Sequence, residues 1–510
     1  MDKWILFPIL LPVIAGSGLL SSAFLEYVRA AKRHGNGKTA GFAPSEGNLK
    51  RIHILTGTVL VLTAVSAAGL AWTGDRSLIV FHLMKDIPIC FRIDDVGRLF
   101  VTIVSVVWVA AGIYSFIYMK HEGEEKRYFG SYLIVFGILV ALDFSGNLVT
   151  MYFFYELMTL ASVPLVLHNG SREAIMAALK YLFYSMCGAY LGLFGIFFLY
   201  RYCDTLTFTA GGTLNRILAQ GNREILLAAV FVMLIGFGAK AGMFPLHAWL
   251  PAAHPVAPAP ASAALSGIIV KSGVLAIIRV VYYIVGTDFI RGTWVQTAWI
   301  VLTLITIFMG SMLAYGEPVF KKRLAYSTVS QISYVLFGLA LLTPTAMEGA
   351  LLHTVFHAFV KCALFLTAGI FIFQTGKTRV EEYRGIGRKM PVTLWCYTFA
   401  SLALIGIPPA SGFISKWYLA EGALQAEVGI FRWIGPVILL LSALLTAGYL
   451  LPVAMNGFFP GKELREEADK QEPHAAMLIP LIVLAALALV LGIWPNPLIE
   501  YVRRIAVAVM

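Results

Sequence analysis

GFGAKAGMFPLHAWLPAAHPVAPAP, residues 236–260, places Lys240 in an apolar sequence that also holds five prolines. Proline removes a helical N–H and clashes with the preceding turn, so we expect the helix to break or kink here. GIPPASGFISKWY, residues 406–418, again combines prolines with a lysine, Lys416. The two stretches predict two broken helices.

The composition places both breaks in a membrane. Of 510 residues, 59% are hydrophobic and only 13% are charged, against about 25% in soluble domains. Apolar runs of about 20 residues recur along the chain, long enough to cross a bilayer as helices. We predict an all-α polytopic membrane protein, which excludes secreted, disordered and nucleic-acid-binding proteins. Broken backbone at membrane depth is tolerated only inside protein or along a cavity, so both breaks predict a functional interior.

The apolar runs predict about fourteen transmembrane helices. The breaks fall in the seventh and twelfth spans, and an interval of five spans inverts the second unit relative to the first. We therefore expect two inverted five-helix repeats, each containing a broken helix. The predicted segments are 1–127 with spans 1–3, 128–286 with the first repeat, 294–458 with the second, and 459–510 with the last span and tail.

Basic residues predict the orientation of these spans. Lys and Arg are more frequent in the loops after odd-numbered spans, including a Gly-, Lys- and Arg-rich loop at 29–52. Cytoplasmic loops retain such residues, so both termini are expected on the non-cytoplasmic side of the cell (inner) membrane.

Five lysines lie within apolar runs. A charged side chain at the bilayer centre costs about 2.5–3.5 kcal/mol on insertion scales, so several together predict a polar path through the bundle. For any single lysine the alternative is a structural ion pair or a snorkelling cation, and Lys180 lies nearest a span end. The five are Lys180, Lys240, Lys271, Lys361 and Lys416.

Few carboxylates accompany these lysines. Glu156 lies in NLVTMYFFYELMTLASVPLVL with no cation within one helical turn, so it requires a partner from another helix. We predict an ion pair between Glu156 and Lys240 at mid-membrane. Asp143 and Glu421 lie close to span ends, where contact with water or lipid headgroups explains them.

Histidines complete the set of titratable groups. The spacing of His353, His357 and Lys361 places all three on one helical face. His254 begins the eighth span, with Lys271 about four turns deeper. A histidine relays protons readily near neutral pH, although His353 and His357 could equally be hydrogen-bonded core residues. A metal site lacks support from neighbouring cysteines or carboxylates, and the alignment with Lys361 favours a relay.

These residues resemble the antiporter-like membrane subunits shared by respiratory complex I, group 4 membrane-bound NiFe hydrogenases and Mrp-type cation/proton antiporters. The resemblance covers roughly residues 90–460. Its motifs are RIDDVGRLF, FFYELMTLAS, AALKYLFYS, GAKAGMFPLHAWLPAAHPVAPAPASAALSGIIVKSG, KKRLAYSTVSQISY, HTVFHAFVKCALFLTAG and IPPASGFISKWY.

The resemblance implies roles for individual residues. Each inverted unit would supply a half-channel, joined by charged groups at mid-membrane. Glu156 and Lys240 resemble the glutamate and lysine of the first half-channel, and Lys271 resembles the connecting lysine. The second unit's central relay corresponds to His353, His357 and Lys361, and its terminal lysine, a glutamate in some members, corresponds to Lys416.

We therefore expect a proton- or sodium-translocating subunit of a redox-driven complex, assembled with other membrane subunits. The alternative is a subunit of an Mrp-type antiporter without redox chemistry. A passive scaffold fits poorly with so many costly intramembrane charges. No cofactor, metal or disulfide is expected in this chain, because its five cysteines show no CxxC or CxH spacing. They are Cys90, Cys187, Cys203, Cys362 and Cys396.

Overall fold

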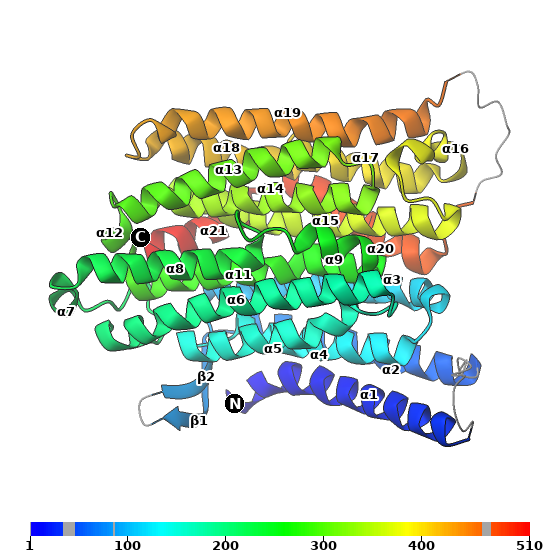
Figure 1. The fold of residues 1–510 in the computed structure, drawn as a ribbon, viewed down its shortest axis with the longest axis horizontal. Coiled ribbons are helices and arrows are strands. Elements are labelled where there is room, and N and C mark those ends of the chain that lie inside the picture. The colour runs from blue at the N-terminus through cyan, green and yellow to red at the C-terminus, as the bar shows by residue number, and fades with distance from the viewer. Residues whose placement is uncertain (1, 34–45, 85–86, 462–470) are drawn as a thin grey trace.

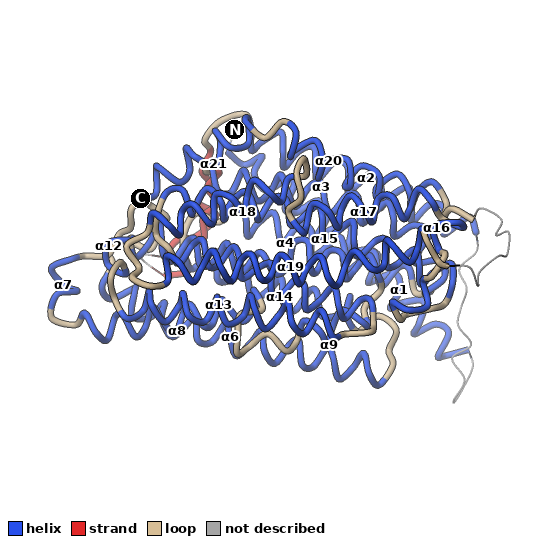
Figure 2. The backbone as a smooth tube through the Cα atoms, turned by 90° about the horizontal axis from the view of Figure 1, so that it is seen from above, coloured by secondary structure: helices blue, strands red, loops and turns tan. Residues whose placement is uncertain are grey.

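The computed structural model describes residues 2–33, 46–84, 87–461 and 471–510. Long helices run side by side along one axis (Figures 1 and 2), and eleven in the described ranges are long and apolar enough to cross a membrane. Helices α4 and α14 lie among them, and α17 with α18 forms one broken crossing. Each of the fourteen predicted spans therefore has a counterpart.

The N-terminal part contains three long helices and one β-hairpin. The hairpin was not predicted, because its apolar stretch is too short to be a span. The end of the bundle that carries this hairpin is called the hairpin end below. Both described chain ends also lie there (Figure 1). The elements are η1 (Asp2–Leu6), α1 (Phe7–Arg33), α2 (Glu46–Trp72), β1 (Arg76–Met84), β2 (Ile87–Ile93) and α3 (Asp95–Glu122).

The predicted basic loop at 29–52 is shorter than expected. Helix α1 continues to Arg33 and α2 begins at Glu46, so helix occupies both edges of the predicted loop. Its central residues, 34–45, lie outside the described residues.

The first five-span unit runs from α4 to η3. Its eighth span contains two π-helical stretches, η2 and η3, on either side of the α11 turn that carries Lys271. The elements are α4 (Glu125–Asp143), α5 (Leu148–Val166), α6 (Arg172–Tyr202), α7 (Arg216–Gln220), α8 (Arg223–Ala241), α9 (Leu250–Val256), α10 (Ala259–Ala264), η2 (Leu265–Ile269), α11 (Val270–Ile278) and η3 (Arg279–Val285).

The second unit runs from α13 to α19 and is followed by two C-terminal helices. A short helix, α12 (Thr287–Ile290), links the two units. The elements are α13 (Trp294–Gly316), α14 (Phe320–Ala340), α15 (Pro344–Thr375), η4 (Val380–Tyr383), α16 (Ile386–Lys389), α17 (Pro391–Ile405), α18 (Ser411–Gln425), α19 (Phe431–Phe458), α20 (Ala475–Ile493) and α21 (Asn496–Val509).

The two units repeat one packing order. In the first, α4 packs on α5, α5 on α6, α6 on the broken helix α8, and α8 on α11. In the second, α13 packs on α14, α14 on α15, α15 on the broken pair α17 and α18, and this pair on α19. Because each unit has five spans, the second is inverted relative to the first.

Both helix breaks start at a glycine with a left-handed backbone. Helix α8 ends at Gly242, with φ of 78°, and α17 ends at Gly406, with φ of 91°. Glycine adopts this conformation without the steric cost that a side chain adds. At the second break α18 also approaches α17 closely, since a Cβ atom on Gly412 would lie 1.8 Å from the carbonyl oxygen of Ala403.

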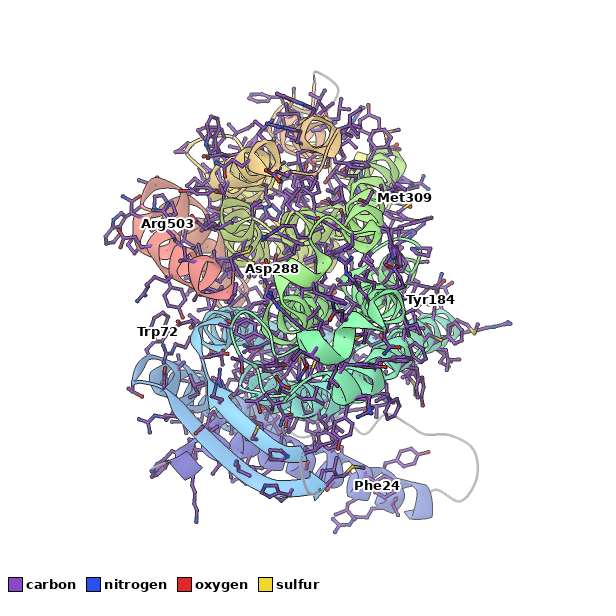
Figure 3. All side chains as sticks on the ribbon, turned by 90° about the vertical axis from the view of Figure 1, so that its left-hand side faces the viewer. Phe24, Trp72, Tyr184, Asp288, Met309 and Arg503 are labelled. Carbon is purple, nitrogen blue, oxygen red and sulfur yellow. The ribbon has the colours of Figure 1, made fainter. Side chains whose placement is uncertain are left out.

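The sides of the bundle carry many exposed apolar side chains, and several charged side chains are buried in its interior. Leu440 and Leu444 on α19 are 72% and 71% exposed, whereas Lys240 is 0% exposed. Seen from the hairpin end, Figure 3 shows side chains such as Phe24, Tyr184 and Met309 projecting from the sides of the bundle. This distribution is expected of a multi-pass membrane protein, whose outer faces meet lipid.

The C-terminal helices close the seam between α3 and the second unit. Helix α20 packs on α3, α15, α17 and α18. A Cβ atom on Gly492 of α20 would lie 2.2 Å from the Pro409 carbonyl oxygen, so α20 touches the second break directly. Helix α21 is tied to α15 by an ion pair between Arg503 and Glu348, 3.3 Å long.

Candidate functional site

Lys240 lies in the last turn of α8, just before the first break, and is fully buried. Its ammonium donates a 2.6 Å hydrogen bond to Thr159 Oγ1 and a 3.5 Å one to the Tyr181 hydroxyl. The rings of Tyr155 and Tyr181 lie 5.3 and 5.0 Å from the ammonium, within range of cation–π attraction. Hydroxyls and aromatic faces therefore hold this cation.

Glu156 lies one turn before Thr159 on α5 and is half-buried. It interacts electrostatically with Lys240. However, the ion pairs within 4.0 Å among the described residues do not include Glu156 with Lys240, so the direct pair expected from the sequence does not form here. Thr159 takes the ammonium instead, while Glu156 Oε1 has no hydrogen-bond partner in the described residues.

Lys271 connects the first unit to a histidine of the second. Its amine donates a 2.6 Å hydrogen bond to the Gly267 carbonyl and is hydrogen-bonded to His357 Nδ1 at 3.0 Å. The side chain is only 2% exposed. Since π-helical turns are frequent at functional sites, the two that flank Lys271 support its importance.

The three α15 groups lie on one buried face, as their spacing predicts. His353 Nδ1 is hydrogen-bonded to Ser415 Oγ of α18 at 2.9 Å, and its ring stacks on Tyr334 with centroids 5.5 Å apart. The His353 and His357 ring centroids are 6.1 Å apart. Lys361, also fully buried, donates a 3.0 Å hydrogen bond to the Leu324 carbonyl.

Lys416 follows the second break and is half-buried. Its ammonium donates to the carbonyls of Leu404 and Ile405, at 2.7 and 2.8 Å, at the end of α17. The Tyr334 ring lies 5.1 Å from it. The break thus frees backbone carbonyls that bind the lysine, and the Tyr334 ring neighbours both Lys416 and His353.

The two secondary candidates lie in different surroundings. Lys180 is exposed on α6, with its ammonium 6.0 Å from the Tyr184 ring centroid, and the structure does not bring it into the buried set. His254 is fully buried and stacks on Phe365 at 4.7 Å. Both of its ring nitrogens lack a hydrogen-bond partner in the described part of the chain.

Several polar residues of this site were not predicted. Thr159, Tyr181 and Ser415 contact the predicted groups, but hydroxyl residues are common in membrane helices and gave no separate signal. Asp143 is the clearest error. The sequence placed it in water or headgroups, whereas it is 2% exposed because the start of α3 and strand β2 cover the end of α4.

Within the described ranges, no group of three or more His, Cys, Asp or Glu side chains is arranged to hold a metal ion. The site consists instead of amines, imidazoles, hydroxyls and carboxylates. Each of these groups can gain or lose a proton or carry a proton through a hydrogen bond. The arrangement is suited to moving protons inside the bundle.

Comparisons with known proteins agree with this geometry. The family described as NADH:quinone oxidoreductase/Mrp antiporter, TM, matches residues 145–446, and the one described as NADH-Ubiquinone oxidoreductase (complex I), chain 5 N-terminus, matches residues 83–129. The chain is 33% identical over 428 residues to NADH-quinone oxidoreductase subunit N of Desulforudis audaxviator, covering 81% of this chain and 84% of that protein.

One further relative and one solved structure cover nearly the whole chain. A Na(+)/H(+) antiporter subunit of Alkalihalophilus pseudofirmus is 27% identical over 507 residues, which covers 99% of this chain and 97% of that one. A chain of an archaeal respiratory complex, the membrane-bound sulfane sulfur reductase, shares the fold with a TM-score of 0.82 at 22% identity, covering 100% of this chain and 98% of that one. The chain therefore belongs to the family of NADH:quinone oxidoreductase and Mrp antiporter transmembrane subunits.

Proposed function

We propose that the chain is the proton- or sodium-translocating membrane subunit of a multi-subunit, redox-driven complex. The observation that carries this proposal is the burial of Lys240, Lys271 and Lys361 inside one bundle, at 0%, 2% and 0% exposure. Intramembrane charges are costly and mark ion or proton pathways. A role in packing alone would be served as well by apolar residues.

Lys240 acts as the proton switch of the first unit. Burial disfavours a charged amine, and a nearby carboxylate favours it. A change in the distance between Glu156 and Lys240 therefore changes how firmly Lys240 holds its proton. Thr159 and Tyr181 hold the loaded ammonium in place.

The second unit passes the proton onward. Lys271 is hydrogen-bonded to His357, whose ring neighbours that of His353, and the Tyr334 ring neighbours both His353 and Lys416. Both termini, and with them the hairpin end, face the non-cytoplasmic side of the cell membrane. Partner subunits carry the redox centres that drive the cycle.

A second function is favoured by one observation. The antiporter relative aligns over 99% of this chain, so a subunit of an Mrp-type cation/proton antiporter is the alternative. Mass spectrometry of the purified complex separates the two. Subunits with nickel or iron–sulfur motifs support the redox-driven complex, and a complex made only of membrane subunits without such motifs rejects it.

Transport by Lys240 variants tests the core of the proposal. Lys240→Ala should lower ion uptake into vesicles by about a hundredfold, normalised to assembled complex. Lys240→Arg should fail too, because a guanidinium stays protonated throughout a transport cycle. If Lys240 only held helices together, Arg would restore function and Ala would reduce assembly. A transport-competent Lys240→Arg variant would reject the switch.

A further inference from the structure

Asp143, the last residue of α4, is a buried acid without a role in the relay described above. Its Oδ2 atom has no hydrogen-bond partner in the residues that the structure describes. An unpaired buried carboxylate is costly to keep, so its presence calls for a function or a partner. The Arg279 guanidinium is the charged group that interacts with it electrostatically.

Asp143 and Lys271 line the same small cavity between α3, α4 and the eighth span. Phe100, Ile103 and Leu139 form apolar walls, and Ser272 adds a hydroxyl. The cavity offers about 10 Å³ to the centre of a water molecule, roughly the space that one water needs. The two residues therefore share one water-sized space.

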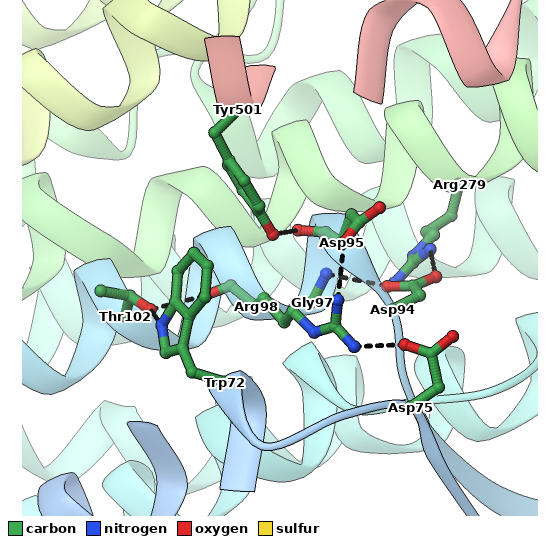
Figure 4. Close-up of polar contacts among 9 residues, drawn as sticks. All are labelled: Trp72, Asp75, Asp94, Asp95, Gly97, Arg98, Thr102, Arg279 and Tyr501. Carbon is green, nitrogen blue, oxygen red and sulfur yellow. Dashed lines mark hydrogen bonds and ion pairs between the residues drawn. The ribbon is translucent and has the colours of Figure 1, made fainter. Parts of the chain in front are cut away.

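Charged pairs continue from Asp143 toward the hairpin end. Arg279 donates two hydrogen bonds to Asp94, at 2.5 and 2.7 Å (Figure 4). Asp95, the residue after Asp94, pairs with Arg98 at 2.8 Å, and Arg98 also pairs with Asp75. The whole of Asp143 is 2% exposed, and the side chains of Asp94, Asp95 and Asp75 are 16%, 48% and 86% exposed, so the acids beyond Asp143 reach increasingly toward water.

Arg279 and Asp94 form the fixed part of this series. The guanidinium lies over the rings of Phe208 and Tyr283, at 4.6 and 4.8 Å. Burial raises the pKa of Asp94, but the Arg279 charge and hydrogen bonds outweigh burial, so this pKa lies below its ordinary value. Asp94 therefore stays ionised, and Asp143 is the member of the series whose buried oxygen is unpaired in the described residues.

We propose that Asp143 is a proton-relay site that connects Lys271 to the hairpin end of the protein. A proton leaves Nζ of Lys271, crosses one water in the cavity and binds a carboxylate oxygen of Asp143, which leaves a neutral amine and a neutral carboxylic acid. Asp143 then releases this proton to water on the side of Asp94 and Asp95. Arg279, permanently protonated, favours the return of Asp143 to its carboxylate form. This relay rests on the proposed function and adds an outlet on the first unit.

Asp143→Asn in the full complex tests the relay, because an amide keeps the shape but cannot carry the proton. Uptake into vesicles, normalised to assembled complex, should fall about tenfold or more. Asp143→Glu, which restores an acid, should recover at least about a third of it. Glu421→Gln is the control, since this acid is exposed and accepts a hydrogen bond from Gln425. Uptake above half of wild type in Asp143→Asn overturns the relay.

A second variant covers the case in which Asp143→Asn fails to assemble. Leu139→Phe fills the cavity and leaves every charge in place, so it should slow uptake, whereas Leu133→Phe, also buried on α4 but away from the cavity, should not. Equal uptake in both rejects the relay.

Lys240→Ala is measured alongside, to separate failure of the relay from failure of the proposed function. Loss in Lys240→Ala with normal uptake in Asp143→Asn rejects only the Asp143 relay, whereas normal uptake in Lys240→Ala rejects the proposed function.

Discussion

Both helix breaks begin at a glycine with a left-handed backbone, but the two breaks bind their lysines in different ways. At the first break, hydroxyls of Thr159 and Tyr181 bind Lys240, and Glu156 lies nearby. At the second, the carbonyls of Leu404 and Ile405 bind Lys416, which has no carboxylate within 4.0 Å among the described residues.

This difference concerns what can change at each site. Backbone carbonyls are fixed acceptors that keep no proton of their own. A hydroxyl can rotate between donating and accepting, and a carboxylate can change its charge. The first break can therefore alter how it binds its lysine within a cycle, whereas the second presents a constant acceptor. We infer that the switch belongs to the first unit and that Lys416 follows it.

Replacement of each lysine by glutamate gives the largest contrast. Lys240→Glu should lower transport by about a hundredfold, because the new acid lies near Glu156 and like charges repel. Lys416→Glu should lower transport by less than about tenfold, because a protonated glutamic acid can donate a hydrogen bond to the freed carbonyls. Ion uptake into vesicles measures both. Equal losses would show that the two breaks do not differ in function.

Gly492→Ala should disturb only the second break. The added methyl would meet the Pro409 carbonyl oxygen at 2.2 Å, and such overpacking costs about 1–3 kcal/mol. Gly69→Ala on α2 is the control, because no atom lies within 4 Å of the position that its added methyl would take. Thermal unfolding of the purified complex measures this loss of stability as a lower melting temperature. An unchanged melting temperature for Gly492→Ala would mean that α20 does not support the break.

Thr159→Val tests whether the hydroxyl matters at the first break. Valine has nearly the same shape but cannot accept the 2.6 Å hydrogen bond from Lys240, and lost hydrogen bonds to charged groups cost about 1.5–3 kcal/mol. We expect transport to fall about tenfold with assembly unchanged. Transport at the wild-type rate would mean that Tyr181 and the Tyr155 ring hold Lys240 without the Thr159 hydroxyl.

Tyr334→Phe should have the smallest effect. The Tyr334 hydroxyl donates to the Leu439 carbonyl, away from Lys416, and the ring that faces Lys416 remains. Transport should stay within about twofold of wild type, because the cation–π contact needs only the ring. A much larger loss would mean that the hydroxyl itself takes part in the second unit's relay.

The sequence was informative where a residue is costly in its surroundings. Prolines in an apolar run predicted both breaks, and of the lysines in such runs Lys240, Lys271 and Lys361 are buried, as expected of costly intramembrane charges. The spacing of His353, His357 and Lys361 predicted their shared face because helical periodicity is a local property. None of these predictions needed knowledge of which helices are neighbours.

Predictions that depended on neighbouring helices were less successful. Which residue of α5 meets Lys240 depends on how α5 is rotated against α8, and that rotation brings Thr159 rather than Glu156 to the ammonium. Asp143 is covered by segments distant in sequence, including Arg92, whose backbone N–H donates to the Phe144 carbonyl at 2.7 Å. The hairpin was missed because β1 and β2 lie between two spans and are shorter than either.

The C-terminal helix has a consequence for how the protein is made. The Tyr501 hydroxyl donates a 2.8 Å hydrogen bond to the backbone carbonyl of Asp95, and Arg503 pairs with Glu348 (Figure 4 shows Tyr501 and Asp95). The first of these contacts joins residues that leave the ribosome more than four hundred positions apart. The backbone carbonyl of Asp95, at the start of α3, therefore gains this partner only after α20 and α21 have been synthesised, so this contact forms late in folding.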